Sequence, residues 1–300
     1  MSIPSADWSD YQAFLAIARS GQLARAARSL DMNPTTVGRR LRRLEAALGT
    51  TLFEQTRTGQ ILTEAGETLL AAVESMDRAA ADITVQNAEG DGLSGTLRIS
   101  TTEGFGIWFL APHLARFQAM HPRLAIDLVS SPGEALSPGR READVAILLA
   151  RPRKGPLVAH KLANYQLGLY ATKGYLEAHG TPRKPADLLH GHTLVGYIPD
   201  LLYAPELRYL DEIHPGLKAT LRSPSITAQH SFVASGAGIG VLPTFMARAD
   251  PRIVNVLRDV RLMRAFWFVT HEDIRRLPRI SEFRQWLDET VRAREDVLTP

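Results

Sequence analysis

One short segment constrains the fold of this chain more than any other, because it predicts a helix with two chemically different sides. Asn33 and Pro34 are typical first residues of a helix, and Gly49 is typical of the position just after one. Between them, apolar residues recur at the spacing of a buried helix face: Val37, Leu41, Leu44 and Leu48. The opposite side carries hydroxyl and guanidinium groups: Thr35, Thr36, Arg39, Arg40 and Arg43.

Two shorter helices are predicted before this one. The first ends at Gly21, and the second runs over Gln22–Leu30 with small alanines on its apolar side. A tight turn at Asp31 and Met32 leads into the third helix. This order is typical of a helix-turn-helix. Because arginine binds guanine or phosphate and threonine contacts base edges, DNA is the expected partner.

A polar hairpin follows the third helix. Leu52-Phe53 and Ile61-Leu62 bracket the sequence EQTRTGQ, which contains Arg57 and Gly59. A hairpin in this position is typical of the wing of a winged helix. We expect Arg57, near its tip, to reach the phosphates or the minor groove of DNA.

The positive charge of the chain is concentrated in this region. Eight arginines between Arg19 and Arg57 stand against three acidic residues, a surplus of five, whereas the whole chain carries only +3. The remainder is therefore slightly acidic. A compact basic segment joined to an acidic body is typical of a nucleic-acid-binding module with a second domain, although a solvated Arg-rich helix gives the same charge.

The stretch from Phe14 to Gly66, with AARSLDMNPTTVGRRLRRLEAALGTTLFEQTRTGQILTEAG at its centre, resembles the winged helix of the LysR-type transcriptional regulators. The matching residues are Ala26-Ala27, Leu30, Val37, Arg39, Leu41, Leu44-Glu45, Leu48-Gly49, Leu52-Phe53-Glu54, Leu62-Thr63 and Ala65-Gly66. The family commonly has Ser-Gln-Pro or Ser-Gln-Ser where this chain has Asn33-Pro34-Thr35, and often Ser where it has Gly38. The operator sequence is therefore not carried over. The resemblance implies a sequence-specific DNA-binding regulator and no enzyme, with operator DNA as partner and RNA polymerase as a candidate further partner.

A helix is predicted to connect this winged helix to the rest of the chain. Its apolar residues follow the spacing of a coiled coil, which an ordinary amphipathic helix matches almost as well: Leu69, Val73, Met76, Ala80 and Ile83. The resemblance implies that this helix pairs two subunits, so a homodimer or homotetramer is expected. The predicted domains are a winged helix over 1–65, a linker and dimerisation helix over 66–89, and an effector-binding domain over 90–300.

The third domain alternates strand and helix patterns, which predicts a mostly parallel α/β sheet. Strands are expected at 96–100, 124–129, 144–149, 166–171, 193–197, 218–221, 238–242 and 265–269, and helices at 105–120, 227–235 and 278–293. The phrases TLRIS, FLAPHLARFQAMHP and SGAGIGVLP resemble those of the family's effector domain. That resemblance implies two subdomains around a cleft, as in periplasmic solute-binding proteins. We expect subdomain I to comprise 90–163 and 270–300, and subdomain II 164–269.

A small-molecule effector is expected in this cleft, at strand ends and helix N-termini. The candidate residues are mostly hydroxyls: Ser100, Thr101, Thr102, Ser130, Ser131, Leu149, Tyr197, Ser223 and Ser225. Hydroxyls would suit a carboxylate or another polar molecule, although serine and threonine also collect in ordinary turns. Glu103, beside Thr102, is unexpected in an anion site.

Other classes of protein find little support. The chain has no cysteine, no apolar run of membrane length and no leader-like start, so a cytoplasmic protein is expected. His190 and His192, with Asp187, match no zinc spacing, and the glycines of 236–240 miss the dinucleotide-binding pattern. No metal, cofactor or catalytic residues are therefore predicted. A rival hypothesis is a solute-binding or enzymatic α/β domain whose N-terminal helices serve only for oligomerisation.

Overall fold

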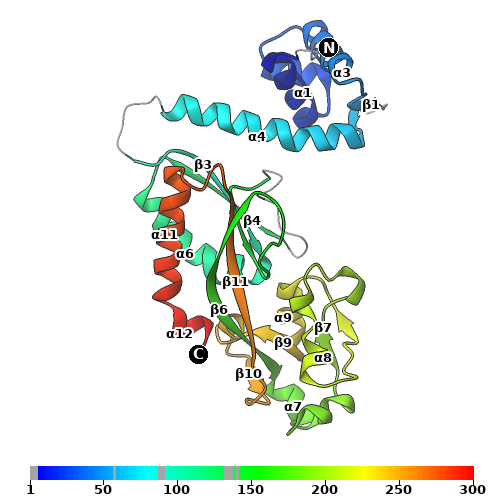
Figure 1. The fold of residues 1–300 in the computed structure, drawn as a ribbon. Coiled ribbons are helices and arrows are strands. Elements are labelled where there is room, and N and C mark those ends of the chain that lie inside the picture. The colour runs from blue at the N-terminus through cyan, green and yellow to red at the C-terminus, as the bar shows by residue number, and fades with distance from the viewer. Residues whose placement is uncertain (1–5, 57–58, 87–91, 132–137, 139–141) are drawn as a thin grey trace. The chain divides into compact units, whose positions relative to one another are not determined.

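The computed structural model describes residues 6–56, 59–86, 92–131, 138 and 142–300. The chain divides into two compact units (Figure 1). The first, here called the head, takes in residues 6–56 and 59–86, and the larger domain takes in 92–131 and 143–300. Arg57 lies outside the described residues.

The head contains four helices and a short hairpin. They are α1 (Trp8–Ser20), α2 (Leu23–Ser29), α3 (Pro34–Leu48), β1 (Phe53–Gln55), β2 (Gln60–Leu62) and α4 (Glu64–Gln86). Gly21 and Gly49 follow α1 and α3 with φ of 66° and 68°, a left-handed conformation that favours glycine. The Asn33 side chain accepts a hydrogen bond from the backbone N–H of Thr35, 2.9 Å away, and caps α3. The expected helices and hairpin are thus confirmed.

One apolar core joins the three helices to the start of α4. Phe14 of α1 and Val37 and Leu44 of α3 are fully buried in this core, as is Val73 of α4. Leu48, which we expected to be buried with them, is 42% exposed, because it lies in the last turn of α3, past the side chains that pack on α1.

The apolar residues of α4 do not share one environment. Val73 is buried in the core of the head, whereas Met76, one turn later, is 46% exposed. The side chain of Ile83 lies outside the described part of the structure. The early turns of α4 are therefore part of the head, and Met76 belongs to a different surface of this helix.

The larger domain combines one sheet with helices. Its strands are β3 (Gly95–Thr102), β4 (Leu124–Ser131), β5 (Val145–Leu148), β6 (Leu157–Thr172), β7 (Leu194–Gly196), β8 (Leu221–Arg222), β9 (Ile239–Pro243), β10 (Ile253–Val256) and β11 (Leu262–His271). Its α-helices are α5 (Glu103–Phe105), α6 (Ala111–Met120), α7 (Lys173–His179), α8 (Tyr209–Ile213), α9 (Ile226–Ala234), α10 (Thr244–Ala247), α11 (Pro278–Arg292) and α12 (Glu295–Leu298). A π-helical turn, η1 (Gly106–Leu110), joins α5 to α6, and 3₁₀ turns occur at η3 (Pro185–Leu189), η4 (Pro199–Leu201) and η5 (Pro205–Leu207).

The sheet is mixed, so the expectation of a mostly parallel sheet is wrong. Its order is β4-β3-β5-β11-β6-β9-β7-β8, with β10 paired to β6. β3 is parallel to β4 and β5, and β7 is parallel to β8 and β9, but β6 and β11 are antiparallel to all their neighbours. These two long strands run side by side through the domain (Figure 1). Alternating strands and helices predict crossover connections, and they give no sign of two strands that pair directly.

The pairing of β6 with β11 changes register between Phe266 and Trp267, which pair with Ala163 and Lys161. Such an extra residue bends a strand locally and increases its twist. The subdomain boundary expected after residue 163 coincides with this irregularity.

Several other expectations need adjustment. The helix expected over 105–120 is divided into α5, η1 and α6, and the strand expected over 218–221 shares only Leu221 with β8. β10 was not predicted, since its few residues lie between Pro251 and the left-handed Leu257, whose φ is 54°. α6 packs on α11 through Phe117, whose ring centroid lies 5.4 Å from that of Phe283. No helix among the described residues is long and apolar enough to cross a membrane.

Candidate functional site

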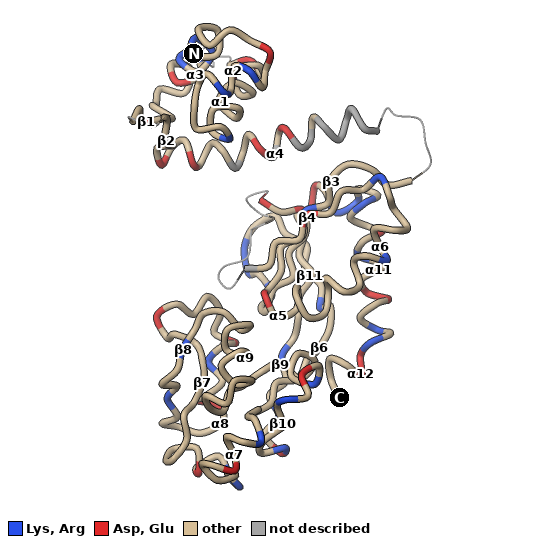
Figure 2. The backbone as a smooth tube through the Cα atoms, turned by 180° about the vertical axis from the view of Figure 1, so that it is seen from behind, with Lys and Arg blue, Asp and Glu red and all other residues tan. Residues whose placement is uncertain are grey.

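The outward side of α3 is basic. Arginines mark α2 and α3, whereas acidic residues mark the described part of α4 (Figure 2). Thr35, Arg39 and Arg42 of α3 are exposed, and the guanidinium groups of Arg39 and Arg42 have no hydrogen-bond or ion-pair partner within the described residues. Arg42 was not among the predicted residues, although it follows the predicted Arg39 by three positions and so lies on the same side of the helix.

The other residues predicted on this side lie in different surroundings. Asn33 is exposed and caps the helix, and its side chain also accepts a hydrogen bond from the Thr35 hydroxyl. Thr36 and Arg40 are half-buried, and Arg40 donates a hydrogen bond to the backbone oxygen of Ser9, 3.3 Å away. Arg40 therefore lies toward α1, on one flank of the outward side.

Arg43 is engaged within the head. Its Nε and Nη2 atoms lie 2.7 and 2.6 Å from the two carboxylate oxygens of Asp10, and Nη2 lies 3.1 Å from Asp7 Oδ2. Asp10 is fully buried, and its hydrogen bond with Arg43 raises the pKa of the guanidinium. Arg43 thus ties α3 to the start of α1, which the sequence spacing did not predict.

The hairpin lies on the other flank of α3. β1 pairs with β2 in antiparallel register from Phe53 with Leu62 to Gln55 with Gln60. A groove of about 470 Å³ separates the hairpin from α3, and Arg42, Thr51 and Gln55 are among the residues that line it. Helix and hairpin together therefore form the winged-helix surface that the sequence predicts.

The larger domain holds a nearly filled cavity of about 30 Å³ beside the carboxyl end of β3 and the start of α9. The structure brings three predicted effector residues to its wall, Thr102, Leu149 and Tyr197. Ser225 caps α9 nearby by accepting a hydrogen bond from the N–H of Ala228, 3.0 Å away.

The remaining predicted residues do not line this cavity. Ser100 and Thr101 are fully buried within β3. Ser130 and Ser131 pair with Thr101 and Thr102 from the neighbouring strand β4. Ser223 accepts a hydrogen bond from the N–H of Ser225, 3.2 Å away, and so supports the turn before α9.

Glu103 carries the charge of the cavity wall. No other described residue that lines the cavity has a formally charged side chain. Its Oε1 accepts a hydrogen bond from the Ser225 hydroxyl, 2.9 Å away, and its Oε2 lies 3.5 Å from the N–H of Thr227. The carboxylate therefore sits at the N-terminus of α9, where the helix dipole favours a negative charge.

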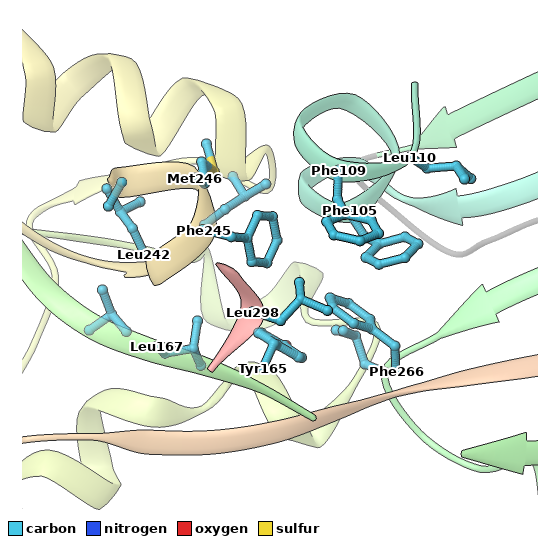
Figure 3. Close-up of a cluster of buried hydrophobic side chains, with 14 of the residues drawn as sticks. Phe105, Phe109, Leu110, Tyr165, Leu167, Leu242, Phe245, Met246, Phe266 and Leu298 are labelled. Carbon is cyan, nitrogen blue, oxygen red and sulfur yellow. The ribbon is translucent and has the colours of Figure 1, made fainter. Parts of the chain in front are cut away.

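Aromatic rings make up much of the remaining wall. Tyr165 stacks on Phe266 with ring centroids 4.1 Å apart, and Phe105 lies 4.5 Å from Phe266 by the same measure (Figure 3). Burial, and then the negative charge of Glu103, raise the pKa of Tyr203 to about 12. Burial also raises the pKa of Tyr197. The tyrosines of this wall are therefore neutral hydrogen-bonding groups at neutral pH.

Two family models match the chain. The model described as the bacterial regulatory helix-turn-helix protein, lysR family, covers residues 8–67, and the LysR substrate binding domain covers residues 90–292. Together they coincide with the head and the larger domain.

Individual proteins agree with these matches. The Mau operon transcriptional activator of Paracoccus denitrificans is 29% identical, over 93% of this chain and 95% of that protein. Transcriptional regulator CrgA of Neisseria meningitidis serogroup C is 30% identical, over 79% of each chain. Among solved structures, CrgA from Neisseria meningitidis aligns with a TM-score of 0.57 at 24% identity, over 96% of this chain and 99% of that one. ArgP from Mycobacterium tuberculosis aligns with a TM-score of 0.67 at 19% identity, over 97% of each chain. With both domains matched over nearly the whole chain, the protein belongs to the LysR family of transcriptional regulators, whose members are not enzymes.

Proposed function

We propose that this regulator binds operator DNA through α3 and the β1–β2 hairpin, and that a small-molecule effector bound in the larger domain changes this binding. The observation that carries the proposal is the pair of exposed guanidinium groups of Arg39 and Arg42, which lack partners among the described residues. A charged group without a partner on a helix that follows a helix-turn-helix pattern is suited to phosphate or guanine.

The structure supports different roles for the predicted DNA-binding residues. Thr35, Arg39 and the additional Arg42 would contact DNA directly, because they are exposed on one side of α3. Asn33 and Arg43 would act by positioning α3, because their side chains already cap the helix and bind Asp10. Thr36 and Arg40 would contact DNA at the flank of α3. Arg57 is still predicted to contact DNA from the wing.

Two-fold pairing of subunits completes the proposal. Two recognition helices that bind successive half-sites require a dimer, or a tetramer that contains such dimers, and α4 offers an exposed Met76 for such a contact. The effector would act by binding one state of the larger domain more tightly than another. Contact with RNA polymerase remains a prediction from the family.

The test begins with the DNA sequence itself, because the operator is not known. The purified full chain selects its preferred duplexes from a random library, and gel-shift titrations measure Kd for the selected duplex over a range of salt concentrations. We expect Arg39→Ala and Arg42→Ala each to weaken binding by about tenfold or more, the effect of a lost base or phosphate contact of about 1–3 kcal/mol. Each lost phosphate contact also lowers the salt slope by about one.

Arg276→Ala is the matched control, because Arg276 is an exposed arginine of the larger domain. Its affinity and salt slope should equal those of the wild type. Failure of the chain to enrich any duplex, or equal affinity in all three variants, would contradict the assignment of α3 as the DNA-binding helix.

A further inference from the structure

We propose that the cavity beside β3 and α9 binds an organic ammonium ion with a short apolar body, and not a carboxylate. The inference rests on the proposed function, since it names the chemical class of the effector that this domain would bind. It differs from the sequence-based expectation of a carboxylate, which relied on the hydroxyls at the strand ends.

The anion position at the N-terminus of α9 is already filled. Three backbone N–H groups of its first turn have acceptors within the chain: Thr227 faces Glu103 Oε2, Ala228 donates to Ser225 Oγ and Gln229 donates to the Ser225 backbone oxygen. An anionic ligand binds such a helix end through free N–H groups. Here it would first have to displace the carboxylate of Glu103.

The wall of the cavity carries a negative charge. Glu103 is held in place by a hydrogen bond from the Ser225 hydroxyl, at the end of α9 where the helix dipole favours a negative charge. The positive charge of Arg264 acts on the neighbouring Tyr165. This guanidinium already forms an ion pair with Glu212 and donates a hydrogen bond to the backbone oxygen of Glu206. The cavity therefore presents a negative group, and the nearby positive one is already compensated.

The remaining wall is largely aromatic. The rings of Phe105, Tyr165, Tyr203 and Phe266 surround the space next to Glu103. Aromatic faces carry partial negative charge and attract ammonium groups, and their apolar surface suits a short hydrocarbon body. The same aromatic faces would strip water from a carboxylate, and the carboxylate of Glu103 would repel it.

The size of the cavity limits the ligand. About 30 Å³ holds roughly two water molecules, at about 10–15 Å³ for each. A cation with one or two carbons fits with small shifts of the rings, whereas a longer one requires the walls to separate. Affinity should therefore fall as the alkyl chain is lengthened.

The experiment is isothermal titration calorimetry of the purified full chain with n-alkylammonium ions of one to six carbons, and with alkanoates of the same lengths. We expect at least one ammonium ion to bind at least tenfold more tightly than the alkanoate of equal length. Glu103→Gln should reduce this preference at least tenfold, while Glu177→Gln, which alters an exposed carboxylate of α7, should leave it unchanged.

A second variant tests the inference even if Glu103→Gln does not fold. Tyr203→Leu keeps Glu103 but removes a ring from the wall. It should weaken the binding of ammonium ions without strengthening the binding of alkanoates. Tighter binding of alkanoates, no heat with any ammonium ion at tens of millimolar, or full ammonium binding by a folded Glu103→Gln would overturn the inference.

Gel shifts with the selected duplex separate this inference from the proposed function. An alkanoate that binds and changes the affinity for DNA leaves the proposed regulator intact and refutes only the positive charge of the effector. A chain that binds ammonium ions but enriches no duplex refutes the proposed function and leaves the cavity assignment standing.

Discussion

Arg43 and Asp10 form a two-point ion pair across the head, with Arg43 Nε and Nη2 at 2.7 and 2.6 Å from the two carboxylate oxygens. The carboxylate is fully buried, whereas the guanidinium side chain is 52% exposed. Asp10 also accepts a hydrogen bond from the backbone N–H of Asp7, 3.2 Å away, at the start of α1. A single carboxylate thus fixes both the first turn of α1 and the position of α3.

Arg43→Ala should therefore lower the Tm of the head by several degrees, because it leaves a buried carboxylate without its cation. Arg42→Ala, on the neighbouring residue, should leave the Tm unchanged and affect only DNA binding. Differential scanning calorimetry of the two variants checks this difference. Equal melting temperatures for Arg43→Ala and the wild type would mean that the ion pair contributes nothing to folding.

Gly66→Ala should destabilise the head. A Cβ at this position would lie 2.2 Å from the backbone oxygen of Leu52, so the contact between α4 and the hairpin would have to open. Gly174→Ala is the matched control, because its Cβ would meet nothing within 4 Å and the residue lies in α7. That change should stabilise the protein by about 0.5–1 kcal/mol. Urea unfolding of both variants measures the two effects, and a stable Gly66→Ala protein would contradict the close packing.

His230 should make stability dependent on pH. It is buried in α9, with Nε2 3.3 Å from Asp250 Oδ2, and burial lowers its pKa below the ordinary 6.5. The unfolded chain therefore takes up a proton below about pH 6.5 that the folded chain resists, so Tm should fall as the pH is lowered from there. His230→Gln should reduce this decline, and His190→Gln, at an exposed site, should not.

Asp250, whose carboxylate lies next to His230, affects the stability of the protein in a lower pH range. Hydrogen bonds from Arg252 lower the pKa of Asp250 from 3.8 to about 2. Its contribution to stability is therefore complete above about pH 4 and is lost as the pH falls toward 2. Asp250→Asn should remove this acid-dependent loss while retaining the decline that begins near pH 6.5, as thermal unfolding between pH 7 and 2 would show.

Phe266→Ala should cost about 3–5 kcal/mol, the range for removing a large aromatic side chain from a core. Phe266 is 2% exposed and stacks on Tyr165. Met263→Ala, in the same strand but at a position that is 49% exposed, should cost far less. The comparison uses urea unfolding followed by circular dichroism. A small effect for Phe266→Ala would show that the rings around it close the space.

The head was predicted from its sequence because its helix ends are local features. The caps at Gly21, Asn33 and Gly49 depend on residues within a few positions of each other, so their pattern is sufficient. The role of Arg43 was missed because its partner Asp10 is 33 residues earlier, and exposure on a helical wheel does not reveal an ion pair.

The cavity was only partly predicted, for a similar reason. Thr102 and Leu149 follow or end strands that the sequence reveals, and Glu103 was noticed for its charge alone. Tyr165 and Phe266 come from the middle of β6 and β11, whose antiparallel pairing joins residues about a hundred positions apart. Such a pairing has no local signature, so the aromatic wall could not be predicted.

The long pairing of β6 with β11 also has a mechanical consequence. Hydrogen bonds between antiparallel strands run perpendicular to the strands, and paired strands are twisted relative to one another. The irregularity between Phe266 and Trp267 bends the pair and increases its twist locally, beside a side chain that lines the cavity. A ligand that displaces Phe266 would therefore act on the paired strands where their twist changes, and so on the relative orientation of the two ends of the domain.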